Sequence, residues 1–376
     1  MISKAALQTQ NSRNVCLDGL RGIAILMVIL FHYFTGFYVF DFGWSGVDLF
    51  FILSGYLLSG RIIPFLDDKK IIWKFYLNRI LRIIPLYFSF LIVFYLAYYF
   101  LASNETQNFS EQLNRPVAFF GFVCNWLFIL FFNPSQHQLS HLWSLAVEEQ
   151  FYLLFPIYVL IIKHQKKLLQ CTILAIALIA VSRCLHMMIY SEMNVLKIYW
   201  NSFYRMDSFL FGVLIYLLNN IGFFNKFYKS IPYILIITTI AILVGGFYEN
   251  TFRVNYFFVT IGFTLNAIVY GCMLIFTLNE NNNFLKRIMA NKLLVFFGKI
   301  SFGLYIFHWP IYLTMFSATN LFAKKLGFNL STQHIQLLNI MFSFLSVTII
   351  SFLSFKYYES IFLKWKQKPV TKPLLS

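Results

Sequence analysis

The feature that most constrains this chain is a series of ten separate apolar stretches, each near the length that crosses a bilayer as a helix, about 20 residues. Lipid offers the backbone no hydrogen-bond partners, so such stretches span a membrane as helices. The sequence therefore predicts an all-α, polytopic integral membrane protein with about ten transmembrane helices. The stretches lie at 20–40, 44–63, 83–102, 141–162, 168–190, 204–220, 232–248, 255–278, 297–317 and 338–360.

Composition agrees with a membrane protein, because 59% of the residues are hydrophobic and only 12% are charged. The net charge of +16 does not indicate a nucleic-acid partner, since the basic residues fall in alternate connections between the apolar stretches. If the N-terminus is inside, 23 of the 30 Lys and Arg residues lie on the inner side. The positive-inside rule then predicts that both termini are cytoplasmic.

Two further segments have an apolar character without the length of a span. Segment 117–132 is predicted to be re-entrant or interfacial, because counting it as a span would put the basic residues that follow on the wrong side. Segment 64–82 mixes Lys and Arg with large apolar residues, which is typical of an amphipathic helix on the cytoplasmic surface.

The chain is interpreted as a single membrane domain over 1–376, with a helical core at about 15–362, a basic cytoplasmic tail at 363–376 and no fused soluble domain. Its five cysteines show no CxxC or metal-ligand spacing, so we expect free thiols and no metal site.

Ionisable residues inside the apolar stretches are the candidate functional residues, because such groups are costly in a membrane. Arg21 and His32 are eleven residues apart, which places them on nearly the same helix face with a rise of about 16 Å between them. Asp48 is expected at a depth similar to that of His32, where a carboxylate can orient the imidazole. The alternative is a membrane anchor for Arg21 and a hydrogen-bonded structural role for His32.

A pair of arginines one helical turn apart, Arg79 and Arg82, is suited to phosphate groups, because each guanidinium can bind an anion bidentately. The alternative is that they anchor the helix at the membrane surface. The sequence has no glycine-rich phosphate loop, so any phosphate would have to be held by arginines.

Three polar residues at helical spacing, Ser144, Glu148 and Tyr152, share one face of a predicted helix. Glu148 rather than the adjacent Glu149 is expected to point into that face. His308 follows Ser301 and Tyr305 in a later stretch and is a second buried histidine, for which a structural hydrogen bond is the alternative to a functional role.

These motifs occur together in one order: Arg21 with His32, the run Phe50-Phe51-Ile52-Leu53-Ser54-Gly55, Arg79 with Arg82, and Ser144 with Glu148 and Tyr152. In this order the chain resembles the acyltransferase-3 family of polytopic membrane O-acyltransferases over nearly its whole length. The resemblance implies transfer of an acetyl or other short acyl group from cytoplasmic acyl-CoA to a hydroxyl of a cell-surface glycan. Acyl-CoA would be a substrate, and no permanently bound cofactor is implied.

The resemblance also implies roles for individual residues. Arg21 and His32 match residues that the family needs for activity, Arg79 and Arg82 match arginines associated with CoA, and Ser144, Glu148 and Tyr152 match a third motif. It implies a bacterial inner-membrane protein that acts alone or with a separate extracytoplasmic transferase. The acceptor stays open among O-antigen, capsule, exopolysaccharide and peptidoglycan.

Two mechanisms and two other functions stay open at this point. His32, oriented by Asp48 or Glu148, can act as general base on the acceptor hydroxyl, or it can carry the acyl group covalently. A transporter or flippase of a lipid-linked glycan would also have about ten spans and buried charges. A non-catalytic scaffold or sensor would tolerate the loss of His32.

Overall fold

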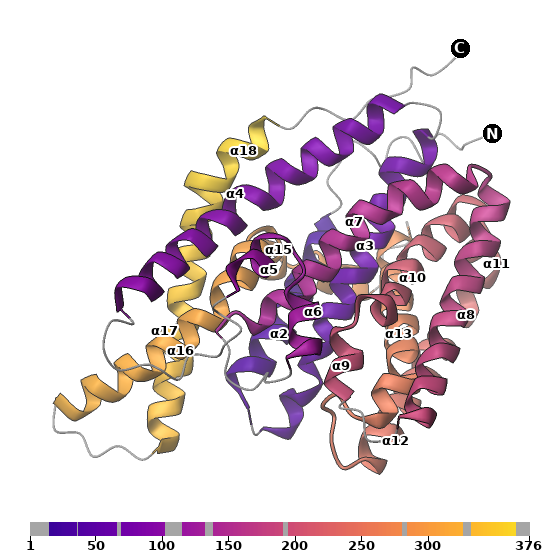
Figure 1. The fold of residues 1–376 in the computed structure, drawn as a ribbon. Coiled ribbons are helices and arrows are strands. Elements are labelled where there is room, and N and C mark those ends of the chain that lie inside the picture. The colour runs from indigo at the N-terminus through magenta and orange to yellow at the C-terminus, as the bar shows by residue number, and fades with distance from the viewer. Residues whose placement is uncertain are drawn as a thin grey trace.

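The computed structural model describes residues 15–35, 37–65, 69–101, 115–131, 138–190, 195–279, 284–325 and 332–365, and within these ranges it contains helices and no strand. The longer helices, drawn in Figure 1, are α2 (Val15–Tyr33), α3 (Gly46–Ile62), α4 (Lys69–Leu101), α7 (Trp143–Ile162), α8 (Gln165–Ile189), α10 (Ser202–Asn220), α12 (Ile231–Tyr248), α13 (Phe263–Leu278), α16 (Ser301–Lys325) and α17 (Thr332–Leu353). Shorter ones are η1 (Tyr38–Ser45), η2 (Ile63–Phe65), α5 (Pro116–Phe120), α6 (Cys124–Leu130), η3 (Ser140–Leu142), α9 (Val195–Trp200), α11 (Phe223–Phe227), η4 (Tyr228–Ser230), η5 (Phe258–Gly262), α14 (Phe284–Met289), α15 (Lys292–Lys299), η6 (Ser354–Glu359) and α18 (Ser360–Lys364).

The predicted class, a polytopic all-helical membrane protein, is confirmed over the described residues. Eight helical segments there are long and apolar enough to cross a bilayer. A ninth is added if α15 and α16, which meet at a 74° bend, count as one broken span. The one remaining predicted stretch, 204–220, corresponds to α10. This helix of 19 residues is long enough to cross a bilayer, but it is too polar to count as apolar by the criterion that the other segments meet.

The two shorter apolar segments fold differently from each other. Segment 64–82 is helical from Lys69 and continues without a break into the third predicted span, as α4 (Lys69–Leu101). Its position on the cytoplasmic surface stays a prediction. Segment 117–132 instead divides into α5 and α6, each too short to cross a bilayer. Asn125 of α6 is fully buried and donates to the carbonyl oxygen of Trp200, so one face of this segment packs against protein. Its re-entrant or interfacial position stays a prediction.

Close approaches of backbone set the helix crossings at the centre of the fold. α2 lies against α15, where a Cβ added to Gly22 would come within 2.0 Å of the Leu294 carbonyl oxygen. α3 lies against α10, where a Cβ on Gly55 would come within 2.0 Å of the Phe209 carbonyl oxygen. Small residues at such crossings let membrane helices pack through their backbones. As a result, α2 packs closely against α15, and α3 packs closely against α10.

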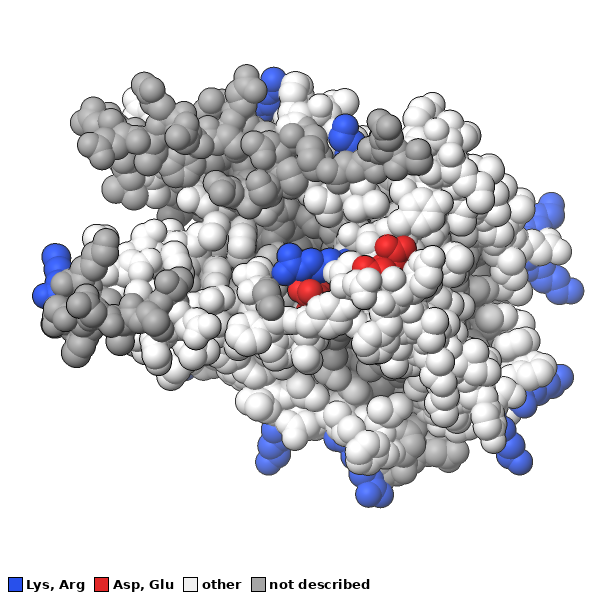
Figure 2. Space-filling model, turned by 90° about the horizontal axis from the view of Figure 1, so that it is seen from below, with Lys and Arg blue, Asp and Glu red and all other residues white. Residues whose placement is uncertain are grey.

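The end of the molecule that lies at the bottom of Figure 1 carries few charges (Figure 2). Figure 2 shows a small group of basic and acidic side chains beside a hollow near the middle of this face, with other Lys and Arg side chains mainly around the rim. The cytoplasmic location of both termini stays a prediction. The predicted tail, 363–376, lies outside the described residues beyond Trp365.

Candidate active site

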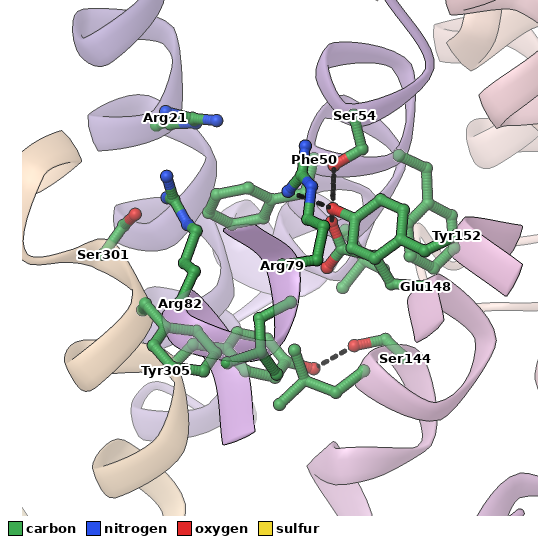
Figure 3. Close-up of a pocket in the computed structure, with 15 residues that line it drawn as sticks. Arg21, Phe50, Ser54, Arg79, Arg82, Ser144, Glu148, Tyr152, Ser301 and Tyr305 are labelled. Carbon is green, nitrogen blue, oxygen red and sulfur yellow. Dashed lines mark hydrogen bonds between the residues drawn. The ribbon is translucent and has the colours of Figure 1, made fainter. Parts of the chain in front are cut away.

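One pocket gathers polar side chains from five helices: α2, α3, α4, α7 and α16 (Figure 3). Its empty volume is about 640 Å³, open space at the mouth included. Its walls are formed by Arg21, Val47, Phe50, Phe51, Ser54, Arg79, Arg82, Ile83, Ser144, Leu145, Glu148, Tyr152, Ser301, Phe302 and Tyr305.

Arginines from two helices line one side of this pocket. Arg21 lies in the second turn of α2, and Arg79 and Arg82 lie one turn apart on α4. The four guanidinium groups of Arg21, Arg61, Arg79 and Arg82 are close enough to repel one another, Arg61 being exposed in the last turn of α3. The carboxylates within reach of these charges are Asp18, Glu148, Glu149 and Glu359. Among the residues that line the pocket, three arginines face the single carboxylate of Glu148, so the arginine cluster in the pocket wall carries an excess of positive charge.

Glu148 is the centre of a hydrogen-bonded group in the pocket wall. It accepts hydrogen bonds from the Ser54 hydroxyl, at 2.5 Å, and from the Tyr152 hydroxyl. Arg79 donates to the Tyr152 hydroxyl at 3.2 Å, and its guanidinium carbon lies 4.3 Å from the centre of the Tyr152 ring. The carboxylate is thus tied through Tyr152 to the arginine cluster (Figure 3).

A second pair of hydroxyl groups, those of Ser144 and Tyr305, lies 2.5 Å apart in the same pocket (Figure 3). The Tyr305 hydroxyl donates its single hydrogen to the carbonyl oxygen of His141, at 2.6 Å. Ser144 must therefore be the donor to Tyr305. Because its proton is committed in this way, Ser144 lacks the activated state of a nucleophile and acts as a wall residue.

Beyond Tyr305 three histidine rings lie in contact, from α2, η3 and α16. The centre of the His308 ring is 4.9 Å from that of His32 and 5.0 Å from that of His141. His308 is fully buried, whereas His32 is partly exposed. Within the described part of the chain, no group of three or more His, Cys, Asp or Glu residues is arranged to hold a metal ion.

Helix register gives the order of these groups through the molecule. Ser144 precedes Glu148 by one turn on α7, and Tyr305 follows Ser301 by about one turn on α16. His308 lies almost one turn beyond Tyr305, and His32 lies about 16 Å along α2 from Arg21. The site therefore runs from the arginines past Glu148 to the Ser144–Tyr305 pair and then to the histidines.

Asp48 does not orient His32, so this prediction is corrected. The Asp48 carboxylate is fully buried in an ion pair with Arg205 and also accepts from the Ser208 hydroxyl, at 3.3 Å. The other predicted orienting group, Glu148, bonds Ser54 and Tyr152, as described above. His32 instead bonds the backbone carbonyl oxygen of Val28 on its own helix, at 2.8 Å between Nδ1 and oxygen.

Most of the candidate residues predicted from sequence are brought together. The pocket contains Arg21, Arg79, Arg82, Ser144, Glu148 and Tyr152, and Glu148 rather than Glu149 faces into it. His32 and His308 lie together outside the pocket. The sequence analysis named Ser54 only as part of the Phe50–Gly55 run and did not connect Tyr305 with Ser144. The position of Ser54 on a helix that already carries Asp48 was the available signal.

Comparison with known proteins gives the same family as the motifs. The profile of the acyltransferase domain family matches residues 14–356. A Staphylococcus aureus (strain COL) protein, provisionally named an O-acetyltransferase, is 30% identical over 313 residues, which are 78% of this chain and 50% of the relative. The peptidoglycan O-acetyltransferase OatA of Listeria monocytogenes is 28% identical over 318 residues, which are 78% of this chain and 49% of that protein.

The chain thus spans about half the length of the curated relatives that it matches. No solved structure matches it significantly. The matched region includes all five helices that line the pocket, and the motifs occur in the family's order. The chain therefore belongs to the acyltransferase-3 family of membrane O-acyltransferases.

Proposed function

We propose that this protein transfers an acetyl or other short acyl group from cytoplasmic acyl-CoA to a hydroxyl of a cell-surface glycan. The observation that carries the proposal is the pocket in which Arg21, Arg79 and Arg82 face the hydrogen-bonded Glu148. The relatives named as O-acetyltransferases, including one named for peptidoglycan, support the choice of acetyl group and of a glycan acceptor.

The arginine cluster suits the phosphate groups of CoA. Guanidinium groups bind phosphate bidentately, and an anion would offset the excess positive charge of the cluster. Arg79 is buried and its Nε has no hydrogen-bond partner among the described residues, so it has a donor to spare. The long pantetheine arm of the donor would then extend past Glu148 toward the histidines.

The proposed transfer uses His32 as the base. His32 Nδ1 donates to the Val28 carbonyl oxygen, so Nε2 keeps its lone pair. Nε2 takes the proton of the acceptor hydroxyl while the oxygen of that hydroxyl forms the new ester bond to the thioester carbonyl carbon. The C–S bond breaks, and the CoA thiolate finally takes up the proton. An acyl-histidine formed at Nε2 is the alternative path to the same products.

The proposed location is the bacterial inner membrane, with the arginines toward the cytoplasm. Membrane lipids surround the protein, and no nucleic acid takes part. Acceptors of one chemical class, hydroxyl-bearing envelope glycans or their lipid-linked precursors, fit a base at the histidine end of the site. A separate extracytoplasmic transferase is a further proposed partner.

The test is a mass spectrum of peptidoglycan, capsule, exopolysaccharide and lipopolysaccharide from host cells that express the wild type or His32→Ala at matched membrane levels. We expect one glycan to gain the mass of an acetyl group that mild base removes, and we expect the gain to vanish in the variant. A glycan modified equally by both proteins would show that His32 is not the base.

A matched control is His186→Ala, because His186 lies on α8 and bonds the Tyr204 hydroxyl outside the pocket. This variant should modify the glycan as the wild type does. If the wild type changes none of the four glycans, transfer to a surface glycan is refuted.

A further inference from the structure

In the cluster of His32, His141 and His308, the buried nitrogen Nε2 of His308 has no hydrogen-bond partner among the described residues. His308 Nδ1 lies 2.7 Å from the carbonyl oxygen of Tyr305, so Nδ1 must carry the hydrogen of the neutral ring. His308 Nε2 is then a bare acceptor, and it has no partner among the described residues. A buried acceptor without a donor is destabilising, so its persistence calls for a functional explanation.

His32 has the same protonation pattern and lies next to it. Its Nδ1 also donates to a backbone carbonyl, that of Val28, and its Nε2 therefore also carries a lone pair. The two ring centres are 4.9 Å apart and the rings are steeply inclined. Two neighbouring acceptors can form a hydrogen bond only after one of them gains a proton.

The two helices are fixed to one another at this level. The Tyr33 hydroxyl on α2 donates to the His308 carbonyl oxygen at 3.0 Å, and the Tyr312 hydroxyl on α16 donates to the Tyr33 carbonyl oxygen at 3.3 Å. The two tyrosine rings stack, with centres 4.5 Å apart, and Trp309 covers another side of His32. The spacing of the two imidazoles is therefore built into the packing of α2 on α16.

We propose that His308 is a positioning residue for His32, and this rests on the proposed function. His32 Nε2 first takes the proton of the acceptor hydroxyl. Once the acceptor oxygen has moved from Nε2 to the thioester carbon, the new N–H donates to His308 Nε2. This hydrogen bond stabilises the imidazolium and holds the ring in place until the proton moves on to the CoA thiolate. His308 itself forms no bond to the substrate.

Other titratable groups near His32 do not supply this stabilisation. From α16 it meets His308 and Trp309, while Tyr312 bonds the neighbouring Tyr33. From η3, His141 lies behind His308. The carboxylates on η1 and α3, Asp41 and Asp48, are paired with Arg253 and Arg205. His308 is thus the group placed to accept from His32 once it is charged.

The experiment measures transfer from radiolabelled acetyl-CoA in membrane vesicles that carry the glycan modified in the cell assay. Full-length wild type, His308→Gln and His308→Asn are compared over a range of pH. The Gln amide reaches the place of Nε2, whereas the Asn amide replaces Nδ1 and its bond to Tyr305. We expect kcat/KM for the acceptor to fall roughly 10–100-fold in His308→Asn, less than loss of a base costs, and by a smaller factor in His308→Gln.

The pH profile separates this role from a purely structural one. His308 favours the protonated form of His32, so without it His32 is a weaker base. The acid limb of the kcat/KM profile should therefore move to lower pH in His308→Asn while the plateau falls. The control is His186→Gln, because His186 of α8 bonds the Tyr204 hydroxyl of α10. This variant should leave both the acid limb and the plateau of the kcat/KM profile unchanged.

The outcomes of this experiment distinguish the role of His308 from the proposed acyl transfer. An unshifted acid limb, wild-type activity in His308→Asn, or complete inactivity of both variants at wild-type membrane level and melting temperature would overturn the role of His308. Transfer by the wild type would leave the proposed function standing in each of these cases. Absence of transfer by the wild type itself would instead refute the proposed function.

Discussion

At the scale of single residues, the site is defined by which hydrogen-bonding groups are already committed. Ser144 gives its proton to Tyr305, and Ser54 and Tyr152 give theirs to Glu148. Free capacity is found at Nε of Arg79, a donor for an anion, and at Nε2 of His308 and of His32, each with a lone pair. This division matches a site that binds a phosphate-bearing donor at one end and handles a proton at the other.

The charge of Glu148 gives a first prediction. In Glu148→Gln the amide oxygen can still accept from Ser54 and Tyr152, so the wall should keep its shape while the negative charge beside Arg79 is lost. We expect the transfer rate to fall about 100-fold or more. Glu149→Gln is the control, because Glu149 is adjacent in sequence but does not line the pocket. Equal rates of acetyl transfer by the two variants in vesicles would contradict the assignment.

Asp48 gives a prediction of the opposite kind, an effect on stability rather than on catalysis. Asp48→Asn leaves the Arg205 charge buried without its partner, and breaking such a pair costs about 3–5 kcal/mol. We expect a lower melting temperature and less protein in the membrane, with unchanged transfer per folded molecule. Arg205→Gln added to Asp48→Asn should restore part of the stability. A folded, inactive Asp48→Asn would instead return Asp48 to the catalytic group.

At the scale of helices, sequence predicted what depends on local spacing and missed what depends on distant partners. The 144, 148 and 152 face of α7 follows from the helical period, and all three residues line the pocket. The partner of Asp48 is 157 positions away in the chain, so no periodicity could identify it. The continuity of α4 was missed because its basic residues indicated a surface helix, although long cationic side chains can reach the interface from within a span.

The crossing of α3 and α10 gives a prediction at this scale. Gly55→Ala places a Cβ 2.0 Å from the Phe209 carbonyl oxygen, so the two backbones must move apart. We expect a loss of about 1–3 kcal/mol in the free energy of unfolding, measured by thermal denaturation in nanodiscs. Gly60→Ala in the same helix is the control, since its Cβ would lie 3.3 Å from the edge of the Tyr216 ring. Equal melting temperatures would show that this crossing has room to spare.

At the scale of the whole molecule, the order of the site along the helices links function to membrane orientation. The arginines lie at the end where α3 finishes and α2 begins, whereas the histidines lie about 16 Å further along α2. A cytoplasmic donor and an outward acceptor therefore require the arginine end to face inward. The positive-inside rule predicts the same orientation from basic residues near the helix ends, including Lys163 between α7 and α8 and Lys166 and Lys167 in the first turn of α8.

Accessibility to a membrane-impermeant thiol reagent tests this orientation. Cys16, Cys124, Cys171, Cys184 and Cys272 are free thiols, so all five can be replaced by serine before single cysteines are introduced. Lys166→Cys lies at the start of α8 beside the basic connection, and Asn250→Cys lies just after α12, at its opposite end from Lys229. In intact spheroplasts we expect Asn250→Cys to react and Lys166→Cys to react only after the membrane is opened.

The labelling result bears directly on the mechanism. The reverse pattern would place the arginine cluster outside, away from the CoA pool, and the proposed direction of transfer would be wrong even if the pocket bound CoA. The cell assay should use the same single-cysteine variants as the labelling, so that orientation and glycan acetylation are measured on the same protein. The labelling result reports on the arginine end of α2, and the loss of acetylation in His32→Ala reports on its histidine end. If labelling places the arginines inside and His32→Ala loses acetylation, the two ends of the site are connected across the membrane.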